Sequence, residues 1–158
     1  MSDTDRYRAG VGMMLLNARG QILICRRLDI EGGAWQMPQG GVLDGESPKK
    51  AAFRELKEEI GTDDVTFLAE SKTWQQYDLP LPLVGRAWGG RYIGQKLKWC
   101  LLRFTGRDDD INVETDQPEF NGWLWVPADH LPDLVVSFKR EMYEAVIAEF
   151  RPMIGPVG

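Results

Sequence analysis

Four glutamates between residues 46 and 59 have a spacing that suits a divalent cation. Glu46 lies in a predicted loop, and Glu55, Glu58 and Glu59 fall on one predicted helix. Successive helical residues turn by about 100°, so the three helical side chains share an arc of roughly 100°. Carboxylates three or four positions apart repel each other by about 0.2–0.5 kcal/mol per pair, and the helix dipole adds to this cost near the C-terminus. A bound divalent cation reverses both effects, so the pattern indicates a metal site.

A solvated acidic face held by ion pairs is the alternative interpretation of these glutamates. Ion pairing along a helix needs a basic residue three or four positions away, best on the C-terminal side. Neither Glu55 nor Glu59 has one four positions towards the C-terminus. Ion pairing therefore explains these two residues poorly.

The helix that carries the acids has clear start and stop signals. Ser47 is a good N-cap, and Pro48 suits the first helical position because it needs no backbone donor. Gly61 fits the left-handed position just after the C-terminus. An apolar stripe beside the acidic face predicts packing on the body of the protein; it consists of Ala52, Phe53, Leu56 and Ile60.

The segment 40–62 resembles the box of the Nudix hydrolases. That box reads Gly, five residues, Glu, seven residues, then Arg-Glu-aliphatic-x-Glu-Glu-x-Gly-aliphatic. The matching positions are Gly40, Glu46, Arg54, Glu55, Leu56, Glu58, Glu59 and Gly61. Thr62 departs from the pattern at a packing position, so the departure does not touch the chemistry.

Further motifs resemble the bacterial RNA pyrophosphohydrolase branch, which shades into the dinucleoside polyphosphate hydrolases. They lie throughout the chain: Tyr7-Arg8, Arg26-Arg27, residues 35–41 (WQMPQGG), 94–96 (GQK), 118–120 (PEF), 123–126 (WLWV) and 137–140 (SFKR). The resemblance implies an α/β/α sandwich with a mixed β-sheet between helices. It implies a hydrolase that removes pyrophosphate from triphosphorylated RNA 5′ ends and leaves a 5′-monophosphate, as in the initiation of mRNA decay.

Two other functions remain open at this stage. A dinucleoside polyphosphate hydrolase would cleave diadenosine tetraphosphate or pentaphosphate and release ATP. A binding module would keep the scaffold without catalysis, although the intact Arg54-Glu55 and Glu58-Glu59 pairs argue against it.

The resemblance also implies roles for individual residues. Metal ligands would be the Gly40 carbonyl with Glu55, Glu58 and Glu59, and Glu119 of the Pro-Glu-Phe motif would complete the site. Catalysis is assigned to Glu58, Glu55 and Glu59, and Glu58 is either a ligand or the base that activates water. Glu46 and Arg54 would pair across the loop–helix junction and orient these acids. Substrate-binding candidates are Arg8 and Arg27 for the polyphosphate, and Tyr77, Phe138 and Lys139 for the 5′ nucleotides.

The amino-acid composition limits which metal ion and which cellular location are expected. His130 is the only histidine, which excludes a multi-histidine metal centre and favours oxygen ligands and Mg²⁺, with Mn²⁺ as a substitute.

Cys25 and Cys100 lie in apolar segments and are expected to be buried thiols. The 158 residues predict one domain over 1–158 with a frayed tail over 152–158. We expect no membrane segment and a cytoplasmic protein, because the apolar runs are short.

The net charge of −5 argues against a protein that coats nucleic acid nonspecifically, but not against one that binds a single polyphosphate end. Basic residues would matter only where they converge on one cleft: Arg6, Arg8, Arg26, Arg27, Arg86, Arg91, Lys96, Lys98, Lys139 and Arg140. The six tryptophans are mostly expected in the core.

Strands and helices alternate along the sequence. Strands are predicted over about 8–17, 21–27, 65–77 (one or two), 96–104 and 123–126, with a short extended piece over 35–38 and a terminal helix over 138–150. Two helices among these strands favour a mixed sheet covered on both faces.

Overall fold

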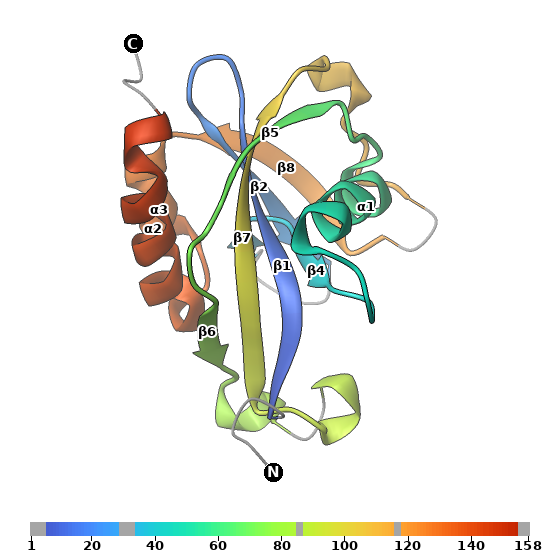
Figure 1. Ribbon diagram of the computed structural model, residues 1–158, viewed down its shortest axis with the longest axis vertical. Coiled ribbons are helices and arrows are strands. Elements are labelled where there is room, and N and C mark those ends of the chain that lie inside the picture. The colour runs from blue at the N-terminus through green and yellow to red at the C-terminus, as the bar shows by residue number, and fades with distance from the viewer. Residues whose placement is uncertain (1–5, 29–33, 85–86, 116–117, 155–158) are drawn as a thin grey trace.

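The computed structural model describes residues 6–28, 34–84, 87–115 and 118–154. Its described strands form one mixed sheet around a long parallel pair, in which Arg8 lies opposite Gln95 (Figure 1). The strands are β1 (Tyr7–Leu16), β2 (Ile22–Arg27), β3 (Trp35–Gln36), β4 (Gln39–Gly41), β5 (Val65–Glu70), β6 (Gln75–Asp78), β7 (Gly94–Phe104) and β8 (Phe120–Val126). The α-helices are α1 (Pro48–Ile60), α2 (Leu131–Leu134) and α3 (Arg140–Ile154).

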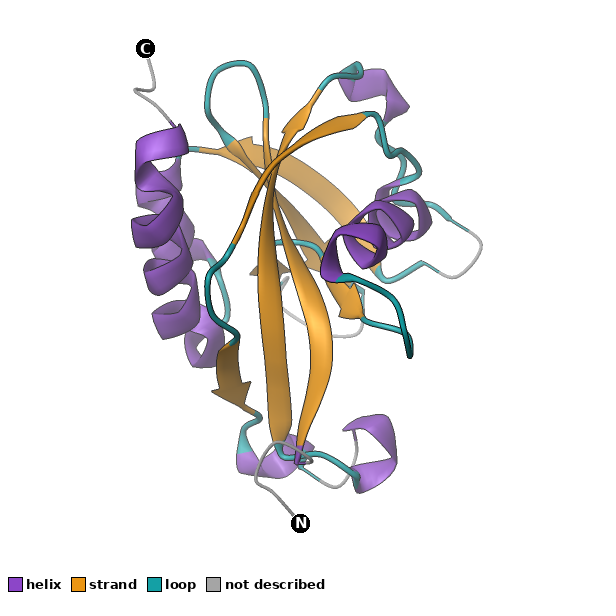
Figure 2. Cartoon of the chain, in the orientation of Figure 1, coloured by secondary structure: helices purple, strands orange, loops and turns teal. Residues whose placement is uncertain are grey.

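Helices cover both faces of this sheet, with α1 on one side and α2 and α3 on the other (Figures 1 and 2). Side chains alternate along a strand, so β1 supplies both interiors. Val11 and Met13 pack on the α1 side, and Met14 and Leu16 pack on the α3 side. The expected α/β/α sandwich is confirmed.

Local sequence signals place α1. The side chain of Ser47 accepts a hydrogen bond from the Lys50 amide at 3.2 Å, and Pro48 is the first helical residue. Gly61 ends the helix with a φ of 77°, a left-handed conformation that glycine adopts without steric cost. The predicted bounds and caps of the acidic helix are therefore confirmed.

The C-terminal helix differs from its prediction at both ends. A 3₁₀ turn over Ser137–Lys139 precedes α3, which runs from Arg140 to Ile154 instead of ending at Phe150. Ile154 is only 5% exposed, so its burial holds the last turn in place despite Pro152 inside the helix. Residues 152–154 are thus helical, and the remainder of the predicted tail, 155–158, lies outside the described residues.

Other expectations are met in part. Both cysteines are free and buried, as predicted. Trp99 is fully buried, whereas Trp74 is 43% exposed and is an exception to the expectation that the tryptophans lie mostly in the core. Arg86 lies outside the described residues. No helix in the described part of the chain combines the length and apolarity needed to cross a membrane.

Candidate active site

Arg54 connects the loop before α1 to the acidic face of the helix. Its guanidinium donates to both carboxylate oxygens of Glu46 at 2.9 Å and to the Gly41 carbonyl at 2.8 Å. It also donates to Glu55 at 2.8 Å and to Glu58 at 3.3 Å. The Arg54 side chain, followed by the Leu43 amide, lowers the pKa of Glu46 to about 2. One arginine therefore sets the positions of three glutamates.

Gly40 lies directly against the carboxyl group of Glu55. A Cβ at residue 40 would overlap this carboxyl group, and a Cβ at Gly41 would overlap the guanidinium of Arg8. Strand β4 pairs with β1 through Gly40 and Val11, which fixes this close approach. Two adjacent glycines thus let the backbone lie close to the carboxyl group of Glu55 and the guanidinium of Arg8.

Glu59 is the most deeply buried acid of the group. It is 5% exposed, and neither carboxylate oxygen has a hydrogen-bond partner among the described residues. Burial, then the charges of Glu119 and Glu55, raise the pKa of Glu59 well above its usual value, and Arg27 opposes this shift. A buried carboxylate without donors is costly, so a cation is the expected compensation.

Strand pairing brings Glu119 to this position. The Leu28 amide donates to the Glu119 carbonyl at 3.0 Å, and Arg27 pairs with Phe120 across β2 and β8. The charge of Glu119 also contributes to raising the pKa of Glu55, after burial as the main cause. Glu55, Glu59 and Glu119 are therefore within electrostatic range of one another.

Glu58 is oriented differently from its two helical neighbours. Its side chain is 58% exposed and pairs with Arg54. Among the described residues, no three acidic, histidine or cysteine side chains lie close enough together to surround one ion. The structure thus brings Glu55 and Glu59 against the body of the protein and leaves Glu58 at the solvent boundary.

Two of the predicted basic residues approach the acids from the sheet. Burial raises the pKa of Glu59 and of Tyr77, and the charge of Arg27, at the end of β2, opposes both shifts. Arg8 lies against Gly41, and its charge also opposes the rise that burial causes in the pKa of Tyr77. The preceding residue of β2, Arg26, instead donates to Asn121 at 2.7 Å on the β8 side. Arg8 and Arg27 therefore converge near the acidic helix, and Arg26 does not join them.

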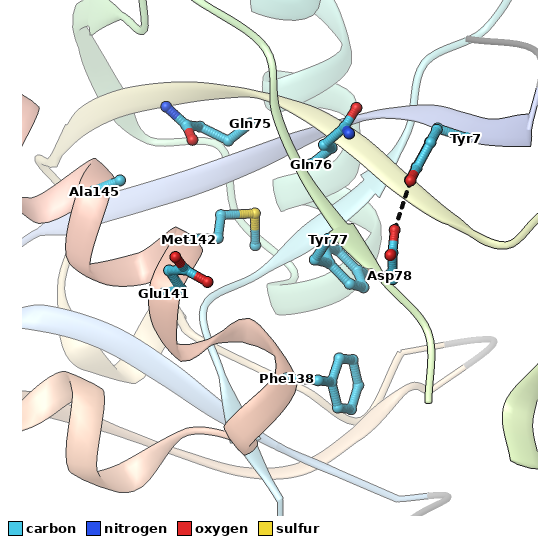
Figure 3. Close-up of a pocket in the computed structure, with 9 residues that line it drawn as sticks. All are labelled: Tyr7, Gln75, Gln76, Tyr77, Asp78, Phe138, Glu141, Met142 and Ala145. Atoms are coloured by element: carbon cyan, nitrogen blue, oxygen red, sulfur yellow. Dashed lines mark hydrogen bonds between the residues drawn. The ribbon is translucent and has the colours of Figure 1, made fainter. Parts of the chain in front are cut away.

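Tyr77 and Phe138 lie together at the wall of a cavity of about 600 Å³ (Figure 3). Their ring centroids are 5.7 Å apart, with the planes tilted by 41°. The cavity lies between β6 and the start of α3, where Met142 and Glu141 contribute from the helix. Tyr77 is only 7% exposed and Phe138 is partly buried, so Phe138 offers the more accessible ring.

Lys139 is buried instead of lying on the surface of this cavity. It is 3% exposed, and its ammonium donates to the side-chain oxygens of Gln36 and Gln39, each at 3.0 Å. The amide of Gln39 then donates to Gln95 at 2.7 Å and to the Tyr77 hydroxyl at 3.2 Å. Lys139 thus fixes the residue that precedes Gly40.

The glutamine network escaped prediction from the sequence. Gln36, Gln39 and Gln95 are each at most 9% exposed. Polar residues within strands of otherwise apolar neighbours are the signal that could have pointed to them, because buried amides need partners.

Comparisons with known proteins agree with this geometry. The NUDIX domain family matches residues 6–146. The chain is 57% identical over 143 residues to an RNA pyrophosphohydrolase of Rhodospirillum rubrum, a match covering 90% of this chain and 86% of the relative. It is 49% identical over 148 residues to an RNA pyrophosphohydrolase of Rickettsia conorii, covering 94% and 92%.

Solved structures share the fold at lower identity. The dihydroneopterin triphosphate pyrophosphohydrolase of E. coli superposes with a TM-score of 0.67 at 20% identity, covering 90% of this chain and 98% of that one. A C. elegans Ap4A hydrolase complex gives 0.61 at 17% identity, covering 90% and 98%. The match over residues 6–146, together with these close relatives, shows that the chain belongs to the Nudix family.

Proposed function

We propose that this chain is a metal-dependent RNA pyrophosphohydrolase. It would hydrolyse the anhydride between the α- and β-phosphates of a triphosphorylated RNA 5′ end, leaving RNA 5′-monophosphate and pyrophosphate. Two relatives of that name, 57% and 49% identical over most of their length, support this substrate. A newly made transcript is an intracellular substrate, so we also propose a cytoplasmic location.

The observation that carries the proposal is the burial of Glu59 beside Glu55 and Glu119. Two carboxylate oxygens without donors, near two further acids, suit a hard cation with oxygen ligands. We propose that Mg²⁺, or Mn²⁺ as a substitute, would be held by Glu55, Glu59 and the Gly40 carbonyl. Glu58 and Glu119 would complete the site by turning towards the ion when it binds, because no three acidic side chains among the described residues already surround one position. The cation neutralises phosphate charge and lowers the pKa of bound water.

Each acid has a role that follows from its surroundings. Glu58 is the most exposed of the helical acids, and contact with solvent suits a base that takes the proton of the attacking water. Arg54 holds Glu55 and Glu58 in fixed orientations, and Glu46 holds Arg54. Glu46 and Arg54 are therefore positioning residues.

The substrate would lie across the sheet edge from the acids to the Phe138 cavity. Arg8 and Arg27 offer planar guanidinium groups, which suit bidentate contacts with phosphate. Stacking of a base on an aromatic ring contributes about 1–3 kcal/mol and tolerates any base. We assign this stacking to Phe138, with the buried Tyr77 as its support and Lys139 as the residue that holds β4 in place.

Hydrolysis of dinucleoside polyphosphates is the second candidate function. The observation in its favour is the open aromatic cavity, because a ring that stacks any base would also accept the second nucleoside of diadenosine tetraphosphate. The same acids would then serve both reactions.

A direct comparison of substrates tests the proposal. Purified protein with Mg²⁺ is incubated with triphosphorylated RNA carrying unpaired 5′ nucleotides, with free nucleoside triphosphate, and with diadenosine tetraphosphate. The expected result is the highest kcat/KM for the RNA and release of pyrophosphate, or of orthophosphates in succession. Equal or faster turnover of the free nucleotide would refute RNA as the preferred substrate, and absence of all turnover would favour a binding module.

A further inference from the structure

An exposed tryptophan surrounded by lysines lies outside the active site. We call it the Trp74 surface and define it as Trp74, Lys96 and Lys98. Trp74 is 43% exposed, and the ammonium groups of Lys96 and Lys98 lie 5.5 Å and 5.9 Å from the centre of its ring. Neither lysine forms an ion pair with another described residue. The surface is therefore both aromatic and positively charged.

Strand pairing explains why these side chains gather on the α1 side of the sheet. Leu97, between the two lysines, faces the α3 core, so Lys96 and Lys98 face the opposite side. Lys98 also donates to the Lys72 carbonyl at 3.2 Å. Lys49, at the start of α1, lies 5.0 Å from the ring of Phe67, which pairs with Leu102 further along β7, so it is not part of this group.

This arrangement has a cost that a polyanion would remove. Two ammonium groups near one ring repel each other, and the chain as a whole has a net charge of −5. Positive charge concentrated at one place on an acidic protein attracts an anionic partner locally without coating the rest of the molecule. Phosphates between the lysines would remove the repulsion, and the free part of the Trp74 ring would accept a base.

The Trp74 surface and the Phe138 cavity lie on opposite faces of the sheet, on the two sides of the edge strand β6. Gln75 and Gln76 line that cavity, and Trp74 immediately precedes them in the chain. From Tyr77 to Trp74 the extended chain spans about 10 Å, the length of a few nucleotides at most. A strand of RNA that leaves the cavity and passes around the edge strand β6 would therefore reach Trp74.

We propose that the Trp74 surface binds the single-stranded RNA downstream of the 5′ end, an inference that rests on the proposed function. Lys96 and Lys98 contact backbone phosphates, and Trp74 stacks on one base. This contact is independent of sequence, because every base has a ring face and every nucleotide a phosphate. It makes turnover depend on RNA length.

The test compares a triphosphorylated dinucleotide with an unstructured triphosphorylated RNA of about 12 nucleotides, a length within the range that such grooves cover. The variants are Trp74→Ala and the double variant Lys96→Gln/Lys98→Gln. The matched charge control is Arg19→Gln/Arg107→Gln, which removes two exposed charges that follow the C-terminal ends of β1 and β7, whereas Lys96 and Lys98 lie near the start of β7. Turnover of the dinucleotide reports whether each variant is folded and catalytically intact.

For the wild type, we expect a higher kcat/KM with the longer RNA. Trp74→Ala should lower that value roughly 5- to 150-fold and leave dinucleotide turnover unchanged. The lysine variant should reduce the salt dependence of the longer RNA, the slope of log(kcat/KM) against log[salt], by about 1.4, at about 0.7 per phosphate contact on a single strand. The arginine control should leave both quantities unchanged.

Equal kcat/KM for the two RNAs, or an unchanged value and salt slope in both variants, would overturn the inference while leaving the proposed function intact. The latter result would point to a protein partner for this surface. If the wild type hydrolyses neither RNA, the proposed function fails and the inference fails with it.

Discussion

Arg54 donates one hydrogen bond to each carboxylate oxygen of Glu46, from Nε and Nη2, both at 2.9 Å. A bidentate pair of this kind is geometrically specific as well as strong. It joins the loop after β4 to the helix. Because Arg54 also donates to the Gly41 carbonyl, hydrogen bonds hold the backbone at Gly41 and the acids on α1 together.

Replacing Glu46 with Gln should change how stability depends on pH. The pKa of Glu46 is lowered in the folded state from its ordinary 4.5 to about 2, chiefly by Arg54. A lowered carboxyl pKa contributes stability above about pH 4.5, and this contribution is lost as the pH falls towards 2. Urea unfolding of both proteins between pH 3 and pH 7 is the measurement. The gap between wild type and Glu46→Gln should narrow as pH falls, and a constant gap would contradict this account.

Glu58→Gln should abolish most turnover without unfolding the protein. Loss of a general base lowers kcat by about 10²- to 10⁴-fold. The exposed pair with Arg54 contributes only about 0.3–0.5 kcal/mol, so stability should hardly change. Glu144→Gln is the matched control, because Glu144 pairs with Arg140 at the same spacing and the same 3.3 Å distance on α3. Steady-state kinetics on triphosphorylated RNA are the measurement, and an unaltered kcat would refute the role of Glu58.

Gly40→Ala should damage both stability and activity. The added methyl group would overlap the Glu55 carboxyl, and overpacking of this kind costs about 1–3 kcal/mol. Displacing Glu55 should also lower kcat. Gly122→Ala is the control, since the nearest atom to a Cβ there is an Arg26 nitrogen at 3.6 Å, an ordinary contact. Thermal unfolding and kcat are measured for both variants. Equal Tm and kcat values would show that the space at Gly40 is not required.

The acidic helix could be predicted because its signals are local. Ser47, Pro48 and Gly61 specify where α1 begins and ends, and helical periodicity alone places Glu55 and Glu59 on one face. Those features depend on residues within one or two turns of each other. No pairing between distant segments has to be known.

The remainder of the site depends on contacts between distant segments. Glu119 reaches Glu59 only because β8 pairs with β2, which periodicity cannot predict; the Pro-Glu-Phe motif alone suggested it. Burial of Lys139 escaped prediction because lysine is rarely buried, and its partner Gln39 lies 100 residues away. Trp74 is exposed because it precedes the short strand β6, which lies at the edge of the sheet.

Lys139→Met tests whether this lysine holds the structure or contacts the substrate directly. In the structure its ammonium is 3% exposed and satisfies the oxygens of Gln36 and Gln39. Removing it leaves two buried acceptors without this donor, which costs about 1–3 kcal/mol. Lys50→Met, at an exposed site, should change stability by at most about 0.5 kcal/mol. Chemical denaturation gives the stability, and steady-state kinetics on triphosphorylated RNA give KM. A raised KM with unchanged stability would show that Lys139 contacts substrate without supporting β4.

Glu59→Gln should stabilise the metal-free protein and weaken its response to Mg²⁺. Without metal, the wild type buries a carboxyl group whose two oxygens lack donors, and burial together with Glu119 and Glu55 raises its pKa and disfavours its ionised form. A neutral amide at this position can donate to a neighbouring carboxylate, so the variant should be more stable in EDTA by about 1–3 kcal/mol. Addition of millimolar Mg²⁺ should raise the Tm of the wild type, because a ligand that binds only the folded state stabilises it. The variant should lose most of this rise, whereas Glu70→Gln, at an exposed site on β5, should keep it. An equal Mg²⁺ response in all three proteins would place the cation elsewhere and remove Glu59 from the metal site.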